Sequence, residues 1–206
     1  PEYKVENGKT LLKTPEGYMP IEVFGAHNLN NLAGAKWICQ NMGIDEADFY
    51  EAIASFKGAS KRLEKIAESA HKVAYKDFAH SPSKVAATTK AVKEQYPDRT
   101  LVACLELHTY SSLNAEFLKE YQGALDAADV AVVFYSPDAV KIKRLEEVTY
   151  EQIAQSFKRD DLIIYTSPQD FKAYLFGLNL DNSALLLMSS GNYGGLNFDE
   201  FKNLIQ

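Results

Sequence analysis

Apolar and polar positions divide the chain into two stretches with different patterns. In the first, two short strand-like runs flank Asn7-Gly8, a dipeptide typical of two-residue hairpins, and a third run covers 18–24. Apolar residues at helical spacing follow over 28–42, and again from Asp45, a candidate N-cap, to residue 56. We therefore expect a small unit of strands and two helices over the first sixty residues.

From residue 70 onward, strand-length apolar runs alternate with predicted helices. The runs cover 71–78, 100–107, 130–135, 162–166 and 184–188, and the helices lie near 82–96, 113–128, 147–158 and 169–177. Strands that are buried on both faces have this near-continuous apolar character. The pattern predicts an α/β fold, with a mainly parallel, Rossmann-like sheet between flanking helices. Lys57-Gly-Ala-Ser60 interrupts the pattern, so we place a boundary there, giving domains 1–56 and 57–206.

Composition excludes several classes of protein. The 206 residues are 46% hydrophobic and 24% charged, and 22 basic against 28 acidic side chains give a net charge of −6. This charge argues against nonspecific binding to nucleic acid or anionic lipid. No apolar run approaches the length of a membrane span, and we expect a cytoplasmic protein. Cys39 and Cys104 form neither a disulfide framework nor a zinc pattern. The chain opens with Pro1 rather than Met.

Polar residues gather after the predicted strands. In open parallel sheets, ligands bind at the carboxyl ends of strands, which here are the loops 77–82, 107–114, 136–138, 166–170 and 189–195. Asp77 could accept hydrogen bonds from sugar hydroxyls, and His80 could bind an anionic or zwitterionic substrate. The alternative for this loop is a capping turn with a packed histidine.

Two more groups suit a nucleotide. His27 and Asn31 are four residues apart, so both can project from one helical face and read the edge of a base. Capping of the helix by Asn28 is the alternative. Arg62 could pair with a phosphate, although a solvated charge cluster of Lys61, Arg62 and Glu64 is the commoner use of such residues.

Two later loops are chemically less specific. Tyr110, Ser111 and Ser112 follow the second strand of the sheet, and either serine could instead cap a helix. The loop 189–195, which contains Asn192, is rich in glycine and could bind an anion through backbone N–H groups. It matches neither the Walker phosphate loop nor a dinucleotide fingerprint, and a tight turn is the commonest use of such a loop.

The order of these segments resembles the Mur ligase family of ATP-dependent amide-forming enzymes. The resemblance rests on Gly25-Ala-His-Asn-Leu-Asn-Asn31, Phe56-Lys-Gly-Ala-Ser-Lys-Arg-Leu-Glu64, Asp77-Phe-Ala-His-Ser-Pro82 and Ser189-Ser-Gly-Asn-Tyr-Gly-Gly195. It looks most like the murein peptide ligase branch, which joins UDP-N-acetylmuramate to a tripeptide in peptidoglycan recycling. The resemblance implies a three-domain parent, of which this chain would be a fragment: residues 1–56 end the central ATPase domain, and residues 57–206 form the acceptor-binding domain.

The resemblance also implies roles for individual residues. His27 and Asn31 would contact adenine, Arg62 the ATP phosphate or ribose, and Asp77 the ribose. Substrate binding would fall to the acceptor-side residues His80, Tyr110, Ser111, Ser112 and Asn192. The 107–114 loop lacks the arginines of several relatives, and Lys61 replaces an arginine common in the family. Residues 57–64 would act as a hinge that closes the C-terminal domain over ATP.

The implied cofactors are ATP and Mg²⁺, whose main ligands would lie outside this chain, so no metal ligand or catalytic base is assigned within it. Two alternatives remain: the sister ligase that adds L-alanine to UDP-N-acetylmuramate, and a noncatalytic nucleotide- or peptide-binding module.

Overall fold

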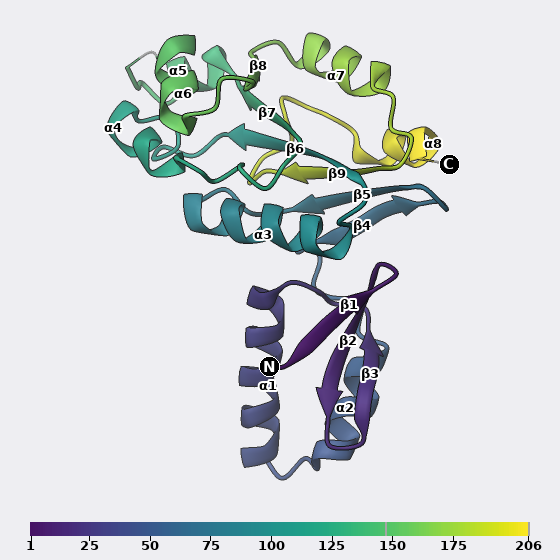
Figure 1. Cartoon of the computed structure of the whole chain (residues 1–206). Helices are drawn as coiled ribbons and strands as arrows, with labels where there is room; N and C mark the ends of the chain where they lie inside the picture. Colours follow the sequence, from purple (N-terminus) through teal and green to yellow (C-terminus); the bar gives the residue numbers. More distant parts are fainter. Residues whose placement is uncertain (147, 206) are drawn as a thin grey trace.

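A computed structural model describes residues 1–146 and 148–205, which form two units, each built on its own sheet (Figure 1). In the N-terminal unit, β1 (Tyr3–Glu6), β2 (Lys9–Thr14) and β3 (Gly17–Ile21) form an antiparallel sheet, and the Asn7-Gly8 turn joins the first two strands as expected. The helices α1 (Ala26–Asn41) and α2 (Glu46–Ala54) bury Leu29 and Phe49 against it.

The C-terminal unit has a six-stranded sheet in the order β4-β5-β9-β6-β7-β8. Its strands are β4 (Glu64–Glu68), β5 (Lys72–Asp77), β6 (Thr100–Leu107), β7 (Val130–Tyr135), β8 (Ile163–Tyr165) and β9 (Ser183–Met188). All neighbouring strands pair in parallel except β4 with β5. The α/β fold with a mainly parallel central sheet is thus confirmed.

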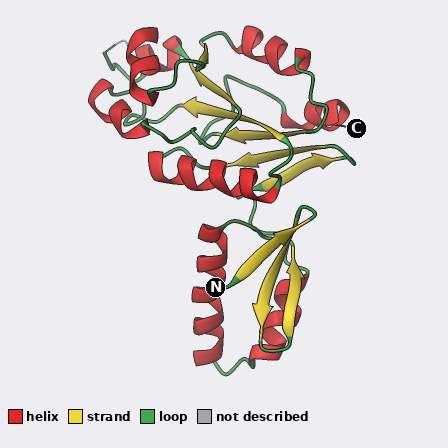
Figure 2. Cartoon of the chain, viewed as in Figure 1, coloured by secondary structure: helices red, strands yellow, loops and turns green. Residues whose placement is uncertain are grey.

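Helices cover both faces of this sheet (Figure 2). Side chains of α3 (Pro82–Gln95), α4 (Ala115–Leu118), α5 (Pro137–Ile142) and α6 (Tyr150–Phe157) share one apolar core, and those of α7 (Pro168–Gly177) and α8 (Phe201–Ile205) share the other. Strand residues alternate between the two cores: in β6, Leu105 and Leu107 face the first, and Cys104 faces the second. The short turns η1 (Lys119–Tyr121) and η2 (Phe198–Glu200) complete the description.

The chain leaves β9 toward a different face of the sheet from that toward which it leaves the neighbouring strands. β5 and β6 lead into α3 and α4 on the first face, whereas β9 leads toward α8 on the second. Asp77 of β5 and Leu105 of β6 both pair with Met188 of β9, so the three strands end at one edge. The crevices beside β9 are therefore topological switch points, where α/β folds bind ligands.

Several local predictions were wrong. The helix expected over 113–128 is only α4 and η1, because Gly123 takes a left-handed backbone (φ 76°) and the segment up to residue 127 forms turns. Asn28 does not cap α1, which begins at Ala26; its amide donates to the Phe24 carbonyl instead. β4, α5 and α8 were not predicted. Position 147, the first residue of the helix expected over 147–158, lies outside the described residues, and α6 accounts for the rest.

Besides the connecting chain, described residues of the two units make several contacts, three of which lie at β5 and α3. Phe24 leaves the N-terminal unit to pack edge-on against Tyr75, with ring centroids 5.3 Å apart. Gly25 (φ 86°) passes so close to α3 that a Cβ there would lie 2.5 Å from the Ala91 Cβ. The Gln95 amide bridges to the hairpin, accepting from the buried Thr10 hydroxyl (2.8 Å) and donating to the Gly8 carbonyl (2.6 Å).

Replacing Gln95 should loosen this junction. In Gln95→Ala both hydrogen bonds are lost and the Thr10 hydroxyl stays buried without its partner, so we expect a loss of about 1–3 kcal/mol in the free energy of unfolding. Chemical denaturation measures this loss, and the backbone amides of β1 and β2 should exchange their hydrogens faster. Lys90→Ala, on the exposed side of the same helix, is the control. Equal unfolding free energies for the two variants would contradict the bridging role.

Candidate active site

A pocket of about 300 Å³ lies between the two units and contains all four residues predicted to bind ATP. His27 and Asn31 come from successive turns of α1, Arg62 from the connecting segment, and Asp77 from the end of β5. Three segments that are well separated in the sequence therefore converge on one cavity. Its size is at the lower end of small-molecule sites, and its lining supplies both donors and acceptors.

The environment of His27 in this pocket shifts the pKa of its side chain. Burial lowers the pKa of its imidazole below the ordinary value, the nearby Asp77 carboxylate opposes that shift, and the Arg62 guanidinium adds to it. A neutral imidazole offers one donor and one acceptor nitrogen, which suits the edge of a nucleobase. Asn31, one turn later, is exposed and adds an amide with the same dual character.

Asp77 holds the connecting segment to the end of β5. Its Oδ2 accepts from the Leu63 backbone N–H (2.7 Å) and its Oδ1 from that of Ala79 (2.6 Å), while the Phe78 N–H donates to the Lys61 carbonyl (2.8 Å). A carboxylate can accept about four hydrogen bonds, so each oxygen keeps capacity for a ligand hydroxyl. Lys61 and Leu63 both have left-handed backbone (φ 56° and 45°), which places Arg62 on a tight turn.

Arg62 is exposed, and within the described residues its guanidinium makes no hydrogen bond or ion pair. It lines this pocket and two adjoining hollows. The alternative of a local charge cluster therefore applies to its neighbours rather than to Arg62, since Glu64 accepts from the Lys61 backbone N–H (2.8 Å) and pairs with Lys76 (3.0 Å). A free guanidinium at a pocket rim is suited to phosphate.

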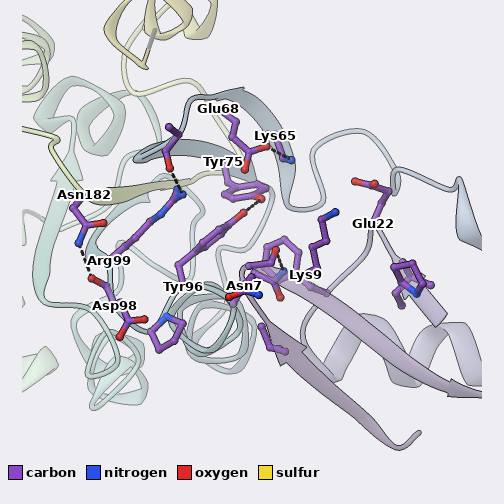
Figure 3. A pocket seen from close by; sticks show the side chains of 18 of the residues that line it. Asn7, Lys9, Glu22, Lys65, Glu68, Tyr75, Tyr96, Asp98, Arg99 and Asn182 are labelled. Carbon is purple, nitrogen blue, oxygen red and sulfur yellow. Dashed lines mark hydrogen bonds and ion pairs between the residues drawn. The ribbon is translucent and has the colours of Figure 1, made fainter. Parts of the chain in front are cut away.

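A larger hollow of about 640 Å³ lies at the amino ends of the strands, away from this pocket (Figure 3). Several of its polar groups already have partners: the Tyr75 and Tyr96 hydroxyls are 2.7 Å apart, Lys65 pairs with Glu68 (2.6 Å), and Arg99 donates to the Ala70 carbonyl (3.2 Å). Because ligands of parallel sheets favour carboxyl ends, we regard the smaller pocket as the functional one.

The residues predicted to bind the acceptor lie along the same carboxyl edge but do not form one closed pocket. His80 is half-buried, and its Nδ1 lies 2.8 Å from the Phe78 carbonyl. Tyr110 is 62% exposed, with the Lys143 ammonium 4.5 Å from its ring centroid. Ser111 is exposed, and Asn192 is an exposed residue whose side chain accepts from the Gly195 N–H (3.1 Å).

Ser112 is placed differently from its neighbours. It is 1% exposed, and its hydroxyl accepts from the Thr109 N–H (2.9 Å) and donates to the Thr109 carbonyl (3.1 Å). The hydroxyl thus stabilises its own turn, whereas Asn114 caps α4, so the alternative that either serine caps this helix is wrong. The part of Ser112 in substrate binding stays a prediction.

One polar residue at this edge was missed from the sequence. Glu106 occupies an otherwise apolar strand, is 3% exposed, and accepts from the Tyr193 N–H (2.9 Å) and from the Ser189 hydroxyl. The signal was a single carboxylate inside the run 100–107, because an acidic side chain in a doubly covered strand must have a local partner.

Nucleotide and metal can be considered separately. The imidazole, amide, guanidinium and carboxylate of the pocket fit a nucleotide's base, phosphate and sugar hydroxyls. Within residues 1–146 and 148–205, no three His, Cys, Asp or Glu side chains come together in a way that could hold a metal ion.

None of the helices described there combines the length and apolarity needed to cross a membrane.

Comparison with known proteins points to one family. No family model matches the chain. It is 31% identical over 160 residues to UDP-N-acetylmuramate–L-alanine ligase of Sulfurihydrogenibium sp., covering 76% of this chain and 34% of the relative. The chain is related to the Mur ligases. Other curated relatives carry the same name, so the family resemblance is supported, whereas the murein peptide ligase branch is not confirmed.

Solved Mur ligases share the fold. The UDP-N-acetylmuramate–alanine ligase of Thermotoga maritima superposes with a TM-score of 0.70 at 16% identity, covering 99% of this chain and 44% of that one. The murein peptide ligase of Psychrobacter arcticus gives 0.61 at 19% identity, covering 97% and 40%. The chain spans about a third of the length of the curated relatives that it matches.

His27 should make stability depend on pH. Its pKa in the folded chain lies below the ordinary 6.5, so the unfolded chain binds the proton more readily. The stabilisation is therefore complete above pH 6.5 and is lost progressively as the pH falls toward the lower, folded-state pKa. His27→Gln should show a flatter fall in thermal midpoint across this range.

The matched control for this measurement is His71→Gln, since His71 is an exposed histidine away from the pocket. Wild type and His27→Gln with parallel midpoint curves would show that the His27 imidazole is not held neutral by burial.

Proposed function

We propose that the chain carries the hinge-side nucleotide contacts and the acceptor domain of an ATP-dependent ligase that forms an amide on UDP-N-acetylmuramate. The observation that supports this most is the convergence of His27, Asn31, Arg62 and Asp77 in one pocket. His27 and Asn31 bind adenine, Asp77 the ribose, and Arg62 the phosphates or ribose. Residues 57–64 form the hinge between a central-domain tail, residues 1–56, and the acceptor-binding domain, residues 57–206.

The reaction we propose has two steps. The carboxylate of the sugar attacks the γ-phosphate of ATP to give an acyl phosphate, and the acceptor amine then displaces phosphate to form the amide. Mg²⁺ supplies charge neutralisation in such phosphoryl transfers, and no step is assigned to it among these residues. This chain contributes by positioning the substrates. The interface between its two units sets where the base, ribose and phosphates lie relative to the acceptor edge.

The acceptor is a cell-wall tripeptide or L-alanine. The tripeptide follows from the motif resemblance, and His80, Tyr110, Ser111, Ser112 and Asn192 on the acceptor side would bind it. L-alanine is the second candidate, and it is supported by curated relatives that are UDP-N-acetylmuramate–L-alanine ligases. Purified full-length protein given ATP, Mg²⁺ and UDP-N-acetylmuramate with either acceptor distinguishes the two by mass spectrometry of the product.

Absence of an ATP-dependent amide product with both acceptors would reject the ligase. Calorimetry on the 206-residue chain with ATP or tripeptide then tests the remaining alternative of a noncatalytic binding module. That alternative requires robust binding by a protein that has no ligase activity.

Removing the Arg62 guanidinium should weaken ATP use. A charge-assisted hydrogen bond contributes about 1.5–3 kcal/mol, so Arg62→Ala should raise the KM for ATP roughly 10- to 100-fold, with the KM for the acceptor unchanged. Arg144→Ala, an exposed arginine that does not line the pocket, should behave like wild type. An unchanged rate for Arg62→Ala at limiting ATP would contradict the phosphate contact.

A further inference from the structure

The crevice between β9 and β6 contains a buried carboxylate, that of Glu106, and few groups offset the cost of burying its charge. Glu106 is 3% exposed, and its Oε2 accepts from the Tyr193 N–H (2.9 Å) and the Ser189 hydroxyl. Its Oε1 has one neighbour of opposite potential charge in the described part of the chain, the His108 ring, whose Nδ1 lies 3.6 Å away. Burying a carboxylate without a hydrogen-bond partner is costly, and the N–H of a neutral imidazole can donate to it.

The loop after β9 closes over this pair. A Cβ on Gly191 would lie 2.8 Å from the Glu106 Oε2 and 3.1 Å from the His108 Cγ, so a side chain at this position would displace the pair. The Gly191 N–H donates to the Ser189 hydroxyl (2.6 Å), which links the loop to Glu106. The Ser190 hydroxyl is buried without a partner among the described residues. His108 itself remains 42% exposed and accessible to a substrate.

The location is the expected one for a reacting group. β9 and β6 leave the sheet toward opposite faces, so their exits flank a topological switch point. β5, which carries Asp77 of the nucleotide pocket, is separated from β6 only by β9. Two strand spacings amount to about 10 Å, so the pair lies within a substrate's length of the nucleotide contacts.

We propose that Glu106 and His108 form a dyad in which His108 is the general base for the acceptor amine and Glu106 is its positioning residue. This inference rests on the proposed ligase function. Glu106 holds the Nδ1–H and leaves Nε2 as the acceptor of a proton, which is the arrangement that carboxylate–histidine pairs use in other enzymes. In the structure Nδ1 and Oε1 are 3.6 Å apart, longer than a hydrogen bond, and catalytic hydrogen bonds commonly shorten when substrate binds.

The chemistry balances without a further reactant. The acceptor arrives as an ammonium ion, and His108 Nε2 takes one proton from it, leaving a free amine. The amine lone pair then forms the C–N bond at the acyl carbon, and the bond from that carbon to the phosphate oxygen breaks. The second proton goes to the departing phosphate, and imidazolium returns its proton to solvent.

Other ionisable groups around the dyad do not take over its role. Tyr193, from the loop after β9, is fully buried, and burial raises the pKa of its hydroxyl well above 10, so it is neutral at working pH. On the side of α5, the Lys143 ammonium lies over Tyr110, the exposed residue two positions after His108. Glu106 is the acidic group within 4.0 Å of the His108 ring nitrogens in the described residues.

The test separates the two chemical steps in the full-length enzyme. In His108→Gln, acyl-phosphate formation, trapped with borohydride before acceptor is added, should remain at the wild-type level. The rate of amide formation near neutral pH should fall roughly 100-fold, because positioned general bases contribute about 10²–10⁴-fold. The deficit should shrink as the pH rises, since the fraction of free amine in solution rises about tenfold per pH unit. Glu106→Gln, which keeps an acceptor for the Tyr193 N–H, should show a smaller loss of the same kind.

His71→Gln is the matched control and should leave both steps unchanged. Unfolding curves confirm that each variant is folded; His108, being partly exposed, is the more tolerant position. If His108→Gln loses both steps equally, or keeps the wild-type rate of amide formation at every pH, the dyad is wrong although the ligase stands. If the wild type forms neither acyl phosphate nor amide, the proposed function fails and the dyad fails with it.

Discussion

The parallel pairing of β5, β9 and β6 is the constraint on which the rest of the molecule depends. Met188 pairs with Asp77 on one side and Leu105 on the other, so three loops begin at the same level. Apolar residues on both faces of each strand fix this register, because a slip of one residue would turn an entire set of side chains toward the wrong core. The polar residues after the strands meet only because the buried residues within them are in register.

Asp77 shows how that register reaches the second unit. As the last residue of β5, it holds the backbone of the connecting segment at Leu63 and its own exit loop at Ala79. The segment thereby presents Arg62 at the pocket. Phe24, which shortly precedes α1, packs on Tyr75, and Gln95 holds the β1–β2 hairpin. The register of the sheet thus determines the conformation of the connecting segment, and that conformation determines the geometry of the pocket.

The sequence predicted what depends on continuous burial and failed where polar or local effects decide. The runs 100–107 and 130–135 coincide with β6 and β7, because doubly covered strands need apolar residues throughout. β4 was missed because an edge strand carries charges, among them Glu64 and Lys65. The long helix over 113–128 was wrong because an apolar pattern there packs as turns around Gly123.

The same distinction applies to the site. Types and spacing made His27, Asn31, Arg62 and Asp77 candidates, and the family resemblance assigned them to ATP, but their convergence depends on contacts between distant segments. Glu106 was not predicted as a site residue because the run that contains it was interpreted as apolar. Its hydrogen-bond partners lie on the loop that folds back over β6. The partners of a buried charge are determined by the tertiary structure, and the spacing of residues along the chain does not predict them.

The two halves of the site depend differently on the arrangement of the units. The nucleotide pocket takes His27 and Asn31 from one unit and Asp77 from the other, so any rotation about residues 57–64 changes its width. Glu106, His108 and the loop after β9 all belong to the C-terminal unit, and such a rotation moves them as one body. In the proposed ligase, closure of the units would therefore change the contacts with the nucleotide and the distance from it to the acceptor edge, while the geometry of the proposed dyad would stay constant.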